Sequence, residues 1–194
     1  CGVVGFRPSP GVVPNELRSV GLNPFSVLGP MGRTVADAAL LLSAMIDDDP
    51  RDPFGSGIDP ELAEPLQPAD LASLRVAISE DLGVAPLDND IRECFRRKID
   101  TIRHIFTDAQ DHDPPFDDDL HRAFEVLRCV NYLSAHGEKV ENHRDLLTPN
   151  VVANVDMAAN FTMPDVAWAH AKQTSLYKGY IKMFTEVELL LSPA

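Results

Sequence analysis

The chain opens with CGVVGFRPSPG (residues 1–11), a stretch that resembles the interior of a protein core rather than a surface terminus. Val3, Val4 and Phe6 favour a strand, and a Pro-Gly pair ends it. The far end, EVELLLSPA (residues 186–194), is an apolar strand that stops just past its last hydrophobic residue. Termini of complete domains usually lie in polar surface segments. We therefore expect the chain to be part of a single domain, truncated at both ends.

Composition limits the classes of protein to which the chain can belong. It is 44% hydrophobic and 24% charged, as in ordinary globular proteins. The longest aliphatic run, residues 38–46, is too short to cross a membrane, so no membrane partner is expected. The net charge of −13 would repel a nucleic-acid backbone, and no basic stripe offsets it.

Cysteine usage bears on the compartment. Three cysteines, an odd number, occur without an export signal, which favours a reducing compartment and predicts a cytoplasmic protein. Cys94 and Cys129 lie inside helical patterns beside apolar neighbours. We expect both to be small core residues.

The order of the predicted elements is that of an α/β protein. Thr34 and Asp37 form a capping box for a helix that ends near residue 46, is apolar nearly all round and should be buried on several sides. The other predicted elements are a strand at 74–79, an amphipathic helix capped by Asp88, a helix over about 119–136 with Gly137 as its left-handed cap, and a helix over about 165–184. Residues 47 to about 70 are rich in Pro, Gly and Asp and predict an irregular surface loop. This alternation indicates a layered α/β/α core with a mixed sheet.

The sequence contains no nucleophile elbow and no phosphate-binding glycine loop. His112 lies among five aspartates with His121 nearby, but the central Gly and closing Glu of a calcium loop are missing, so no metal site is predicted. No cofactor is predicted either. Asn131 and Tyr132 are polar residues on a helix that otherwise looks buried. Hydrogen-bonded core residues are the favoured interpretation, and the wall of a pocket is the alternative.

Taken together, several segments resemble one family, the amidase-signature enzymes. Residues 1–14 resemble the stretch that follows the family's active-site serine. FSVLGPMGRTVADAA (residues 25–39) resembles the next block at compatible spacing, and DPRDP (residues 49–53) matches the loop that comes after it. LLLSPA (residues 189–194) is similar to a late strand of the family. The resemblance implies a partial amidase-signature fold.

The chemistry implied by this resemblance is hydrolysis of a carboxamide C–N bond through an acyl-enzyme. In the family a serine nucleophile is activated by a second serine, in a cis peptide, and by a lysine, and a Gly-Ser-rich loop forms the oxyanion hole. All these groups would lie upstream of residue 1, so no residue of this chain is predicted to be catalytic and the chain alone is predicted to be inactive. It would supply scaffold behind the nucleophile loop and part of a pocket wall, with Asn131 and Tyr132 as candidates.

Two alternatives stay open. The amidase component of a tRNA-dependent amidotransferase shares the same sequence blocks, and a non-catalytic amidase-like scaffold protein would share the fold without the activity. The expected partner is a small-molecule amide substrate, and a homo-oligomer is left open.

Overall fold

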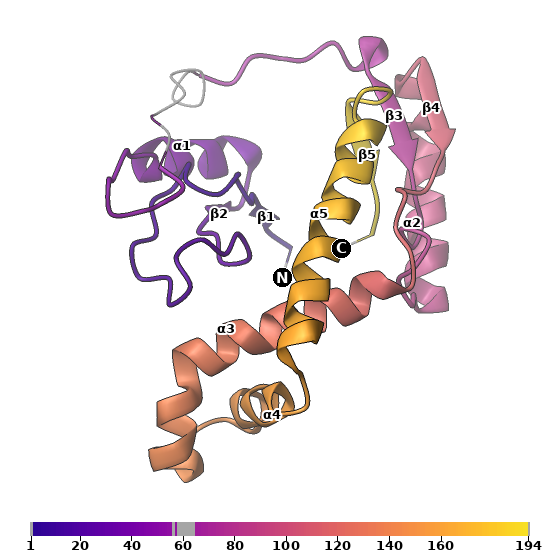
Figure 1. The fold of residues 1–194 in the computed structure, drawn as a ribbon. Coiled ribbons are helices and arrows are strands. Elements are labelled where there is room, and N and C mark those ends of the chain that lie inside the picture. Colours follow the sequence, from indigo (N-terminus) through magenta and orange to yellow (C-terminus); the bar gives the residue numbers. More distant parts are fainter. Residues whose placement is uncertain (1, 56, 58–64, 194) are drawn as a thin grey trace. The chain divides into compact units, whose positions relative to one another are not determined.

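The computed structural model describes residues 2–55, 57 and 65–193 (Figure 1). The chain divides into two compact units, Cys1–Pro68 and Ala69–Ala194, called here the first and second units. That all 194 residues belong to one domain stays a prediction. Across the described ranges, no helix has the length and apolar character needed to cross a membrane.

In its described residues, the first unit contains a short antiparallel sheet and one α-helix. Strand β1 (Val4–Gly5) pairs with β2 (Met31–Gly32), and helix α1 (Val35–Met45) follows β2. The opening strand therefore lies within the predicted stretch. A Cβ at Gly29 would lie only 2.0 Å from the carbonyl oxygen of Phe6, so the approach to β2 needs a glycine there.

Helix α1 begins as predicted but is packed differently. The Thr34 hydroxyl accepts the N–H of Asp37 (3.1 Å), and the Asp37 carboxylate accepts the N–H of Thr34 (3.0 Å). The expectation that α1 is buried on several sides is wrong. Ala38 and Leu42 are its buried residues, whereas Leu40 is 73% exposed. The helix packs against β1 and β2 through one side, and Val35 and Leu41 are exposed together with Leu40.

The predicted loop at 47–70 has no helix or strand in its described parts, 47–55, 57 and 65–70. Residues 65–70 are exposed. Asp52 differs from what a surface loop would predict, because it is 3% exposed. The remaining residues of the predicted loop, 56 and 58–64, lie outside the described part of the chain.

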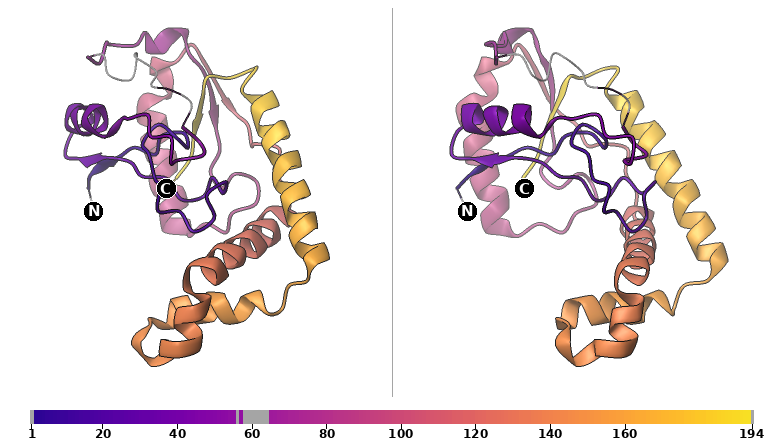
Figure 2. Two further views of the ribbon diagram at one scale, coloured as in Figure 1. Left: turned by 60° about the vertical axis from the view of Figure 1, so that its left-hand side comes forward. Right: turned by 90° about the vertical axis from the view of Figure 1, so that its left-hand side faces the viewer.

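The second unit is built on a parallel sheet of three strands in the order β4-β3-β5. The central strand β3 (Arg75–Ile78) pairs in parallel with β4 (Asp108–Asp111) and with β5 (Leu189–Leu191). Val76 and Ile78 pack with Ile99 of α2 (Asn89–Ile102) in the core. Both views of Figure 2 place this sheet between α2 and α5 (Met163–Met183). The predicted α/β class is confirmed, with the strands divided between this sheet and the β1-β2 pair.

The remaining helices partly follow the prediction. α3 (Asp119–His143) and α5 pack together, and α4 (Pro149–Ala158), which was not predicted, also packs on α3. Short 3-10 turns occupy Leu71–Ser73, Arg103–Ile105 and Arg144–Leu146. The prediction that Gly137 caps α3 is wrong, because the helix continues to His143. Thr162 and Asp165 form a capping box at the predicted start of α5.

Candidate functional site

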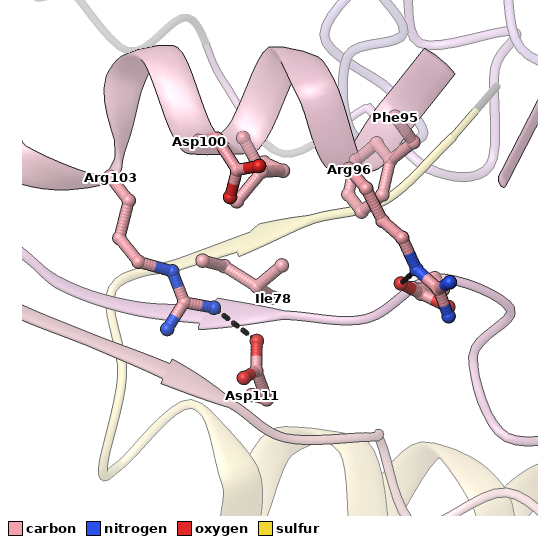
Figure 3. Close-up of a pocket in the computed structure, with 8 residues that line it drawn as sticks. Ile78, Phe95, Arg96, Asp100, Arg103 and Asp111 are labelled. Carbon is pink, nitrogen blue, oxygen red and sulfur yellow. Dashed lines mark hydrogen bonds and ion pairs between the residues drawn. The ribbon is translucent and has the colours of Figure 1, made fainter. Parts of the chain in front are cut away.

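A crevice lies at the carboxyl ends of the parallel strands, where ligands commonly bind in α/β proteins. Its volume is about 360 Å³. Ile78 at the end of β3 forms the floor, and α2 contributes Phe95 and Arg96 (Figure 3). The rest of its lining comes from Glu80, Ile99, Asp100, Arg103 and Asp111. We call this cavity the C-terminal crevice.

The charges of the crevice are largely paired with one another. Glu80 accepts hydrogen bonds from Arg92 Nη1 (2.7 Å) and Arg96 Nη2 (2.9 Å). The hydrogen bond from Arg96, followed in size of effect by that from Arg92, lowers the pKa of Glu80 to about 2. Arg103 forms an ion pair with Asp111 on the other side of Ile78 (Figure 3). The ion pairs therefore tie α2 and the turn after it to the ends of β3 and β4.

The turn that follows β3 is fixed by a buried serine. Ser79 is 2% exposed, and its hydroxyl donates to Asp113 Oδ1 (2.6 Å) and accepts the N–H of Leu82 (2.8 Å). Leu82 adopts a left-handed backbone with φ 56°. Because the hydroxyl is buried and bonded to a carboxylate, Ser79 stabilises this corner rather than facing a substrate.

The two predicted pocket-wall residues lie elsewhere in the second unit. Asn131 and Tyr132 are half-buried in the middle of α3, and they are not among the residues that line the C-terminal crevice. The Tyr132 ring lies 5.7 Å from that of His136, tilted by 50°. One turn earlier, Arg128 lies 5.5 Å above the ring of Phe124. One stripe of α3 therefore carries aromatic rings, a guanidinium and an imidazole at i, i+4 spacing.

The two helical cysteines behave differently. Cys129 on α3 is fully buried, and burial raises the pKa of its thiol, so it is the core residue that was predicted. The same prediction is wrong for Cys94, which is exposed. Phe95 and Ile99 pack in the core between α2 and the sheet, whereas Cys94 is not part of that cluster. In the described ranges, no three His, Cys, Asp or Glu side chains come together as a metal site.

Sequence reasoning missed a buried ion pair in the first unit. Arg18 Nη1 lies 2.6 Å from Asp52 Oδ1, and the two side chains are 2% and 0% exposed. Charged residues in a Pro-Asp-rich loop are usually solvated, so composition gave no indication of this pair. The available signal was the position of Asp52 inside the DPRDP block of residues 49–53.

Comparison with known proteins shows which family the chain matches. The model of the Amidase family matches residues 1–194. Acylamidase of Rhodococcus erythropolis is 24% identical over 194 residues, which is 100% of this chain and 41% of that protein. A subunit of the glutamyl-tRNA(Gln) amidotransferase of Acaryochloris marina is 30% identical over 112 residues, 57% of this chain and 23% of that protein.

Solved structures agree on the fold. A bacterial aryl acylamidase of the amidase signature family superposes with a TM-score of 0.78 at 19% identity, covering 99% of this chain and 41% of that one. The chain thus spans about two fifths of the length of the relatives that it matches from end to end. With the family model matching throughout, as the resemblance of residues 1–14, 25–39 and 49–53 predicted, the chain belongs to the amidase family.

Proposed function

We propose that this chain is part of a cytoplasmic serine amidase that hydrolyses a carboxamide C–N bond through an acyl-enzyme. The observation that carries the proposal is the match of the Amidase family over residues 1–194, together with coverage of 41% of the Rhodococcus acylamidase. In this proposal the nucleophilic serine, the second serine and the lysine belong to polypeptide that precedes residue 1 in the whole enzyme. Residues 1–14, which resemble the stretch after the nucleophile, support that order.

The chain's own polar groups fit a scaffold role. A serine-serine-lysine mechanism needs a lysine that can be neutral and accept a proton. Lys172 shows the opposite, because its ammonium bonds Asp117 Oδ2 (2.5 Å) and lies 3.1 Å from Asp119 Oδ2. The hydrogen bond to Asp117 raises the pKa of Lys172 and keeps it charged. Ser79 is likewise occupied by Asp113. We therefore propose that the chain is inactive by itself.

The substrate is proposed to be a small-molecule amide. The name of the Rhodococcus relative, Acylamidase, favours an N-acyl amide. Asn131 and Tyr132 remain the candidates for one wall of its pocket, and the stripe of α3 that carries Tyr132 offers aromatic surface beside hydrogen-bonding groups.

The amidotransferase alternative has a narrower basis. The amidotransferase relative from Acaryochloris marina matches 57% of the chain, whereas the acylamidase matches all of it. The net charge of −13 also gives a nucleic-acid partner little electrostatic attraction. Glutaminase activity that appears only with a partner protein would favour this alternative.

The test is hydrolysis by the protein encoded in the complete reading frame that contains this chain. We expect release of amine from N-acyl amides, and none from residues 1–194 alone. Tyr132→Phe should raise KM about two- to tenfold if its hydroxyl bonds substrate. Tyr177→Phe, a control at a residue that is 63% exposed, should leave KM unchanged. A complete protein that hydrolyses no amide would contradict the proposal.

A further inference from the structure

A buried guanidinium and a buried carboxylate join three segments of the first unit. Arg18 Nη1 donates to Asp52 Oδ1 (2.6 Å), and Arg18 Nε donates to the carbonyl oxygen of Ser26 (2.9 Å). The second carboxylate oxygen, Asp52 Oδ2, accepts the N–H of Asn15 (2.9 Å). Loop 49–55 is therefore tied to two earlier parts of the chain by directional bonds.

The carboxylate is held in its charged form. Burial alone would raise the pKa of Asp52, but hydrogen bonds from the N–H groups of Phe54 and Asn15 and from Arg18 outweigh it and keep that pKa below its ordinary value. The Arg18 guanidinium also lies 5.1 Å from the centre of the Phe54 ring. The Asp52 carboxylate is thus ionised at neutral pH, and both side chains of the pair are buried.

The loop held by Asp52 lies against the N-terminal segment. Gly11 has φ +91°, and a Cβ there would lie 2.1 Å from the carbonyl oxygen of Phe54. Val13, two residues further, is 4% exposed. The backbone at Gly11 is consequently in close contact with loop 49–55.

The other end of the same segment is also fixed. β1 pairs with β2, and the N–H of Phe6 donates to the carbonyl oxygen of Pro30 (3.0 Å). Arg7 Nη2 donates to the carbonyl oxygen of Pro24 (3.1 Å). Residues 4–13 are therefore held by β2 at one end and by loop 49–55 at the other.

A gain in folding stability does not by itself explain why a buried ion pair occupies this position. A well-packed hydrophobic pair of similar volume is often as stable as a buried ion pair, because both charges lose their hydration. Arg18 Nη2 adds to this loss, since it is buried without a hydrogen-bond partner among the described residues. What an apolar pair could not supply is direction, because the bonds of Arg18 and Asp52 determine where loop 49–55 meets Gly11.

We propose that the Arg18–Asp52 pair positions residues 4–13 and, through them, the nucleophile loop that precedes them in the whole enzyme. The inference rests on the proposed function, in which residues 1–14 follow the catalytic serine. Arg18 and Asp52 are positioning residues that touch no reacting atom, and their effect should appear in kcat rather than in KM.

The first test is Asp52→Asn in the complete enzyme, assayed on an N-acyl amide. We expect kcat to fall about 10- to 100-fold, since a displacement of about 1 Å at the reacting groups has an effect of that size. KM should change less than about threefold. Arg51→Gln is the matched control, because Arg51 lies in the same loop but its side chain is 67% exposed. Its kcat should stay within about twofold of the parent.

A double variant, Arg18→Met with Asp52→Leu, separates positioning from folding. We expect a melting temperature near that of the parent, with kcat still reduced at least about tenfold. Hydrogen exchange in Asp52→Asn should accelerate more at residues 4–13 than in α1, relative to the parent.

Each other outcome has a defined meaning. Recovery of kcat in the double variant, an unchanged kcat in Asp52→Asn, or unchanged exchange at residues 4–13 overturns the positioning role. A double variant that does not fold assigns the pair to folding and overturns it as well. A complete enzyme that is inactive before any substitution defeats the proposed function itself, whereas an active enzyme with unaffected variants defeats only this inference.

Discussion

The two units use the same kinds of charged side chain in opposite surroundings. In the first unit, Arg18 and Asp52 are almost completely buried, and backbone N–H groups complete the shell of the carboxylate. In the second unit, Arg92, Arg96 and Glu80 keep about a quarter or more of each side chain exposed. A buried pair determines position, whereas a half-exposed cluster is screened by water and stabilises little. This contrast predicts effects of different size when each group is removed.

The largest effect is expected from Asp52→Ala, which leaves the Arg18 guanidinium buried without its counter-charge. Removing one partner of a buried pair typically lowers the free energy of unfolding by about 3 to 5 kcal/mol. Unfolding of the first unit can be followed by urea titration with hydrogen exchange at α1. A loss no larger than that of Arg51→Gln, which breaks an exposed ion pair in the same loop, would contradict the difference between buried and exposed pairs.

Acid should weaken both regions in a defined window. In the folded state the pKa of Glu80 is lowered to about 2, and the pKa of Asp52 is also below its unfolded value. The stabilisation from each carboxylate is therefore complete above its unfolded pKa and is lost as pH falls through its folded pKa. The urea midpoint should therefore be flat from about pH 7 to about pH 5 and fall below about pH 4.5. The Arg18→Met, Asp52→Leu double variant should show a shallower fall. A midpoint independent of pH down to about 2 would be inconsistent with both shifts.

The smallest effect is expected from Glu80→Gln in the C-terminal crevice. The side chain is 28% exposed, so solvent screening should limit the loss in unfolding free energy to about 1 kcal/mol or less. Raising the ionic strength from about 0.1 to about 1 M shortens the Debye length from about 10 to about 3 Å and should shrink this loss further. The same salt should leave the effect of Asp52→Ala nearly unchanged. Equal salt sensitivity of the two variants would remove the contrast.

Local sequence signals predicted the elements whose causes are local. The capping boxes at Thr34 and Thr162 and the cap at Asp88 satisfy N–H groups a few residues away, so each start is visible in a short window. Strand β3 was predicted from the alternating pattern of residues 74–79, and its last three side chains are buried. Its partner β4 was missed because DAQD (residues 108–111) has no apolar alternation and is a polar edge strand.

The predictions that were wrong or missing depend on tertiary contacts between distant segments of the chain. Gly137 looked like a helix cap, but α3 continues past it and packs on α4. Burial of Asp52 depends on Arg18, which lies 34 residues away in sequence, so no local pattern could show it. The exposure of Leu40 was missed for the same reason, because composition states that α1 is apolar but not which of its faces is covered. For the site, sequence supplied the family and its order of segments, whereas the pocket role of Asn131 and Tyr132 stays a prediction.

The most direct test of the central claim is to locate the reactive serine. The complete protein and residues 1–194 alone would each be treated with a fluorophosphonate probe, and the labelled peptide would be identified by mass spectrometry. We predict one labelled serine outside residues 1–194, loss of amide hydrolysis in proportion to labelling, and no label on the isolated chain. Labelling of a serine within residues 1–194, or full activity in a protein that takes up no label, would contradict the account.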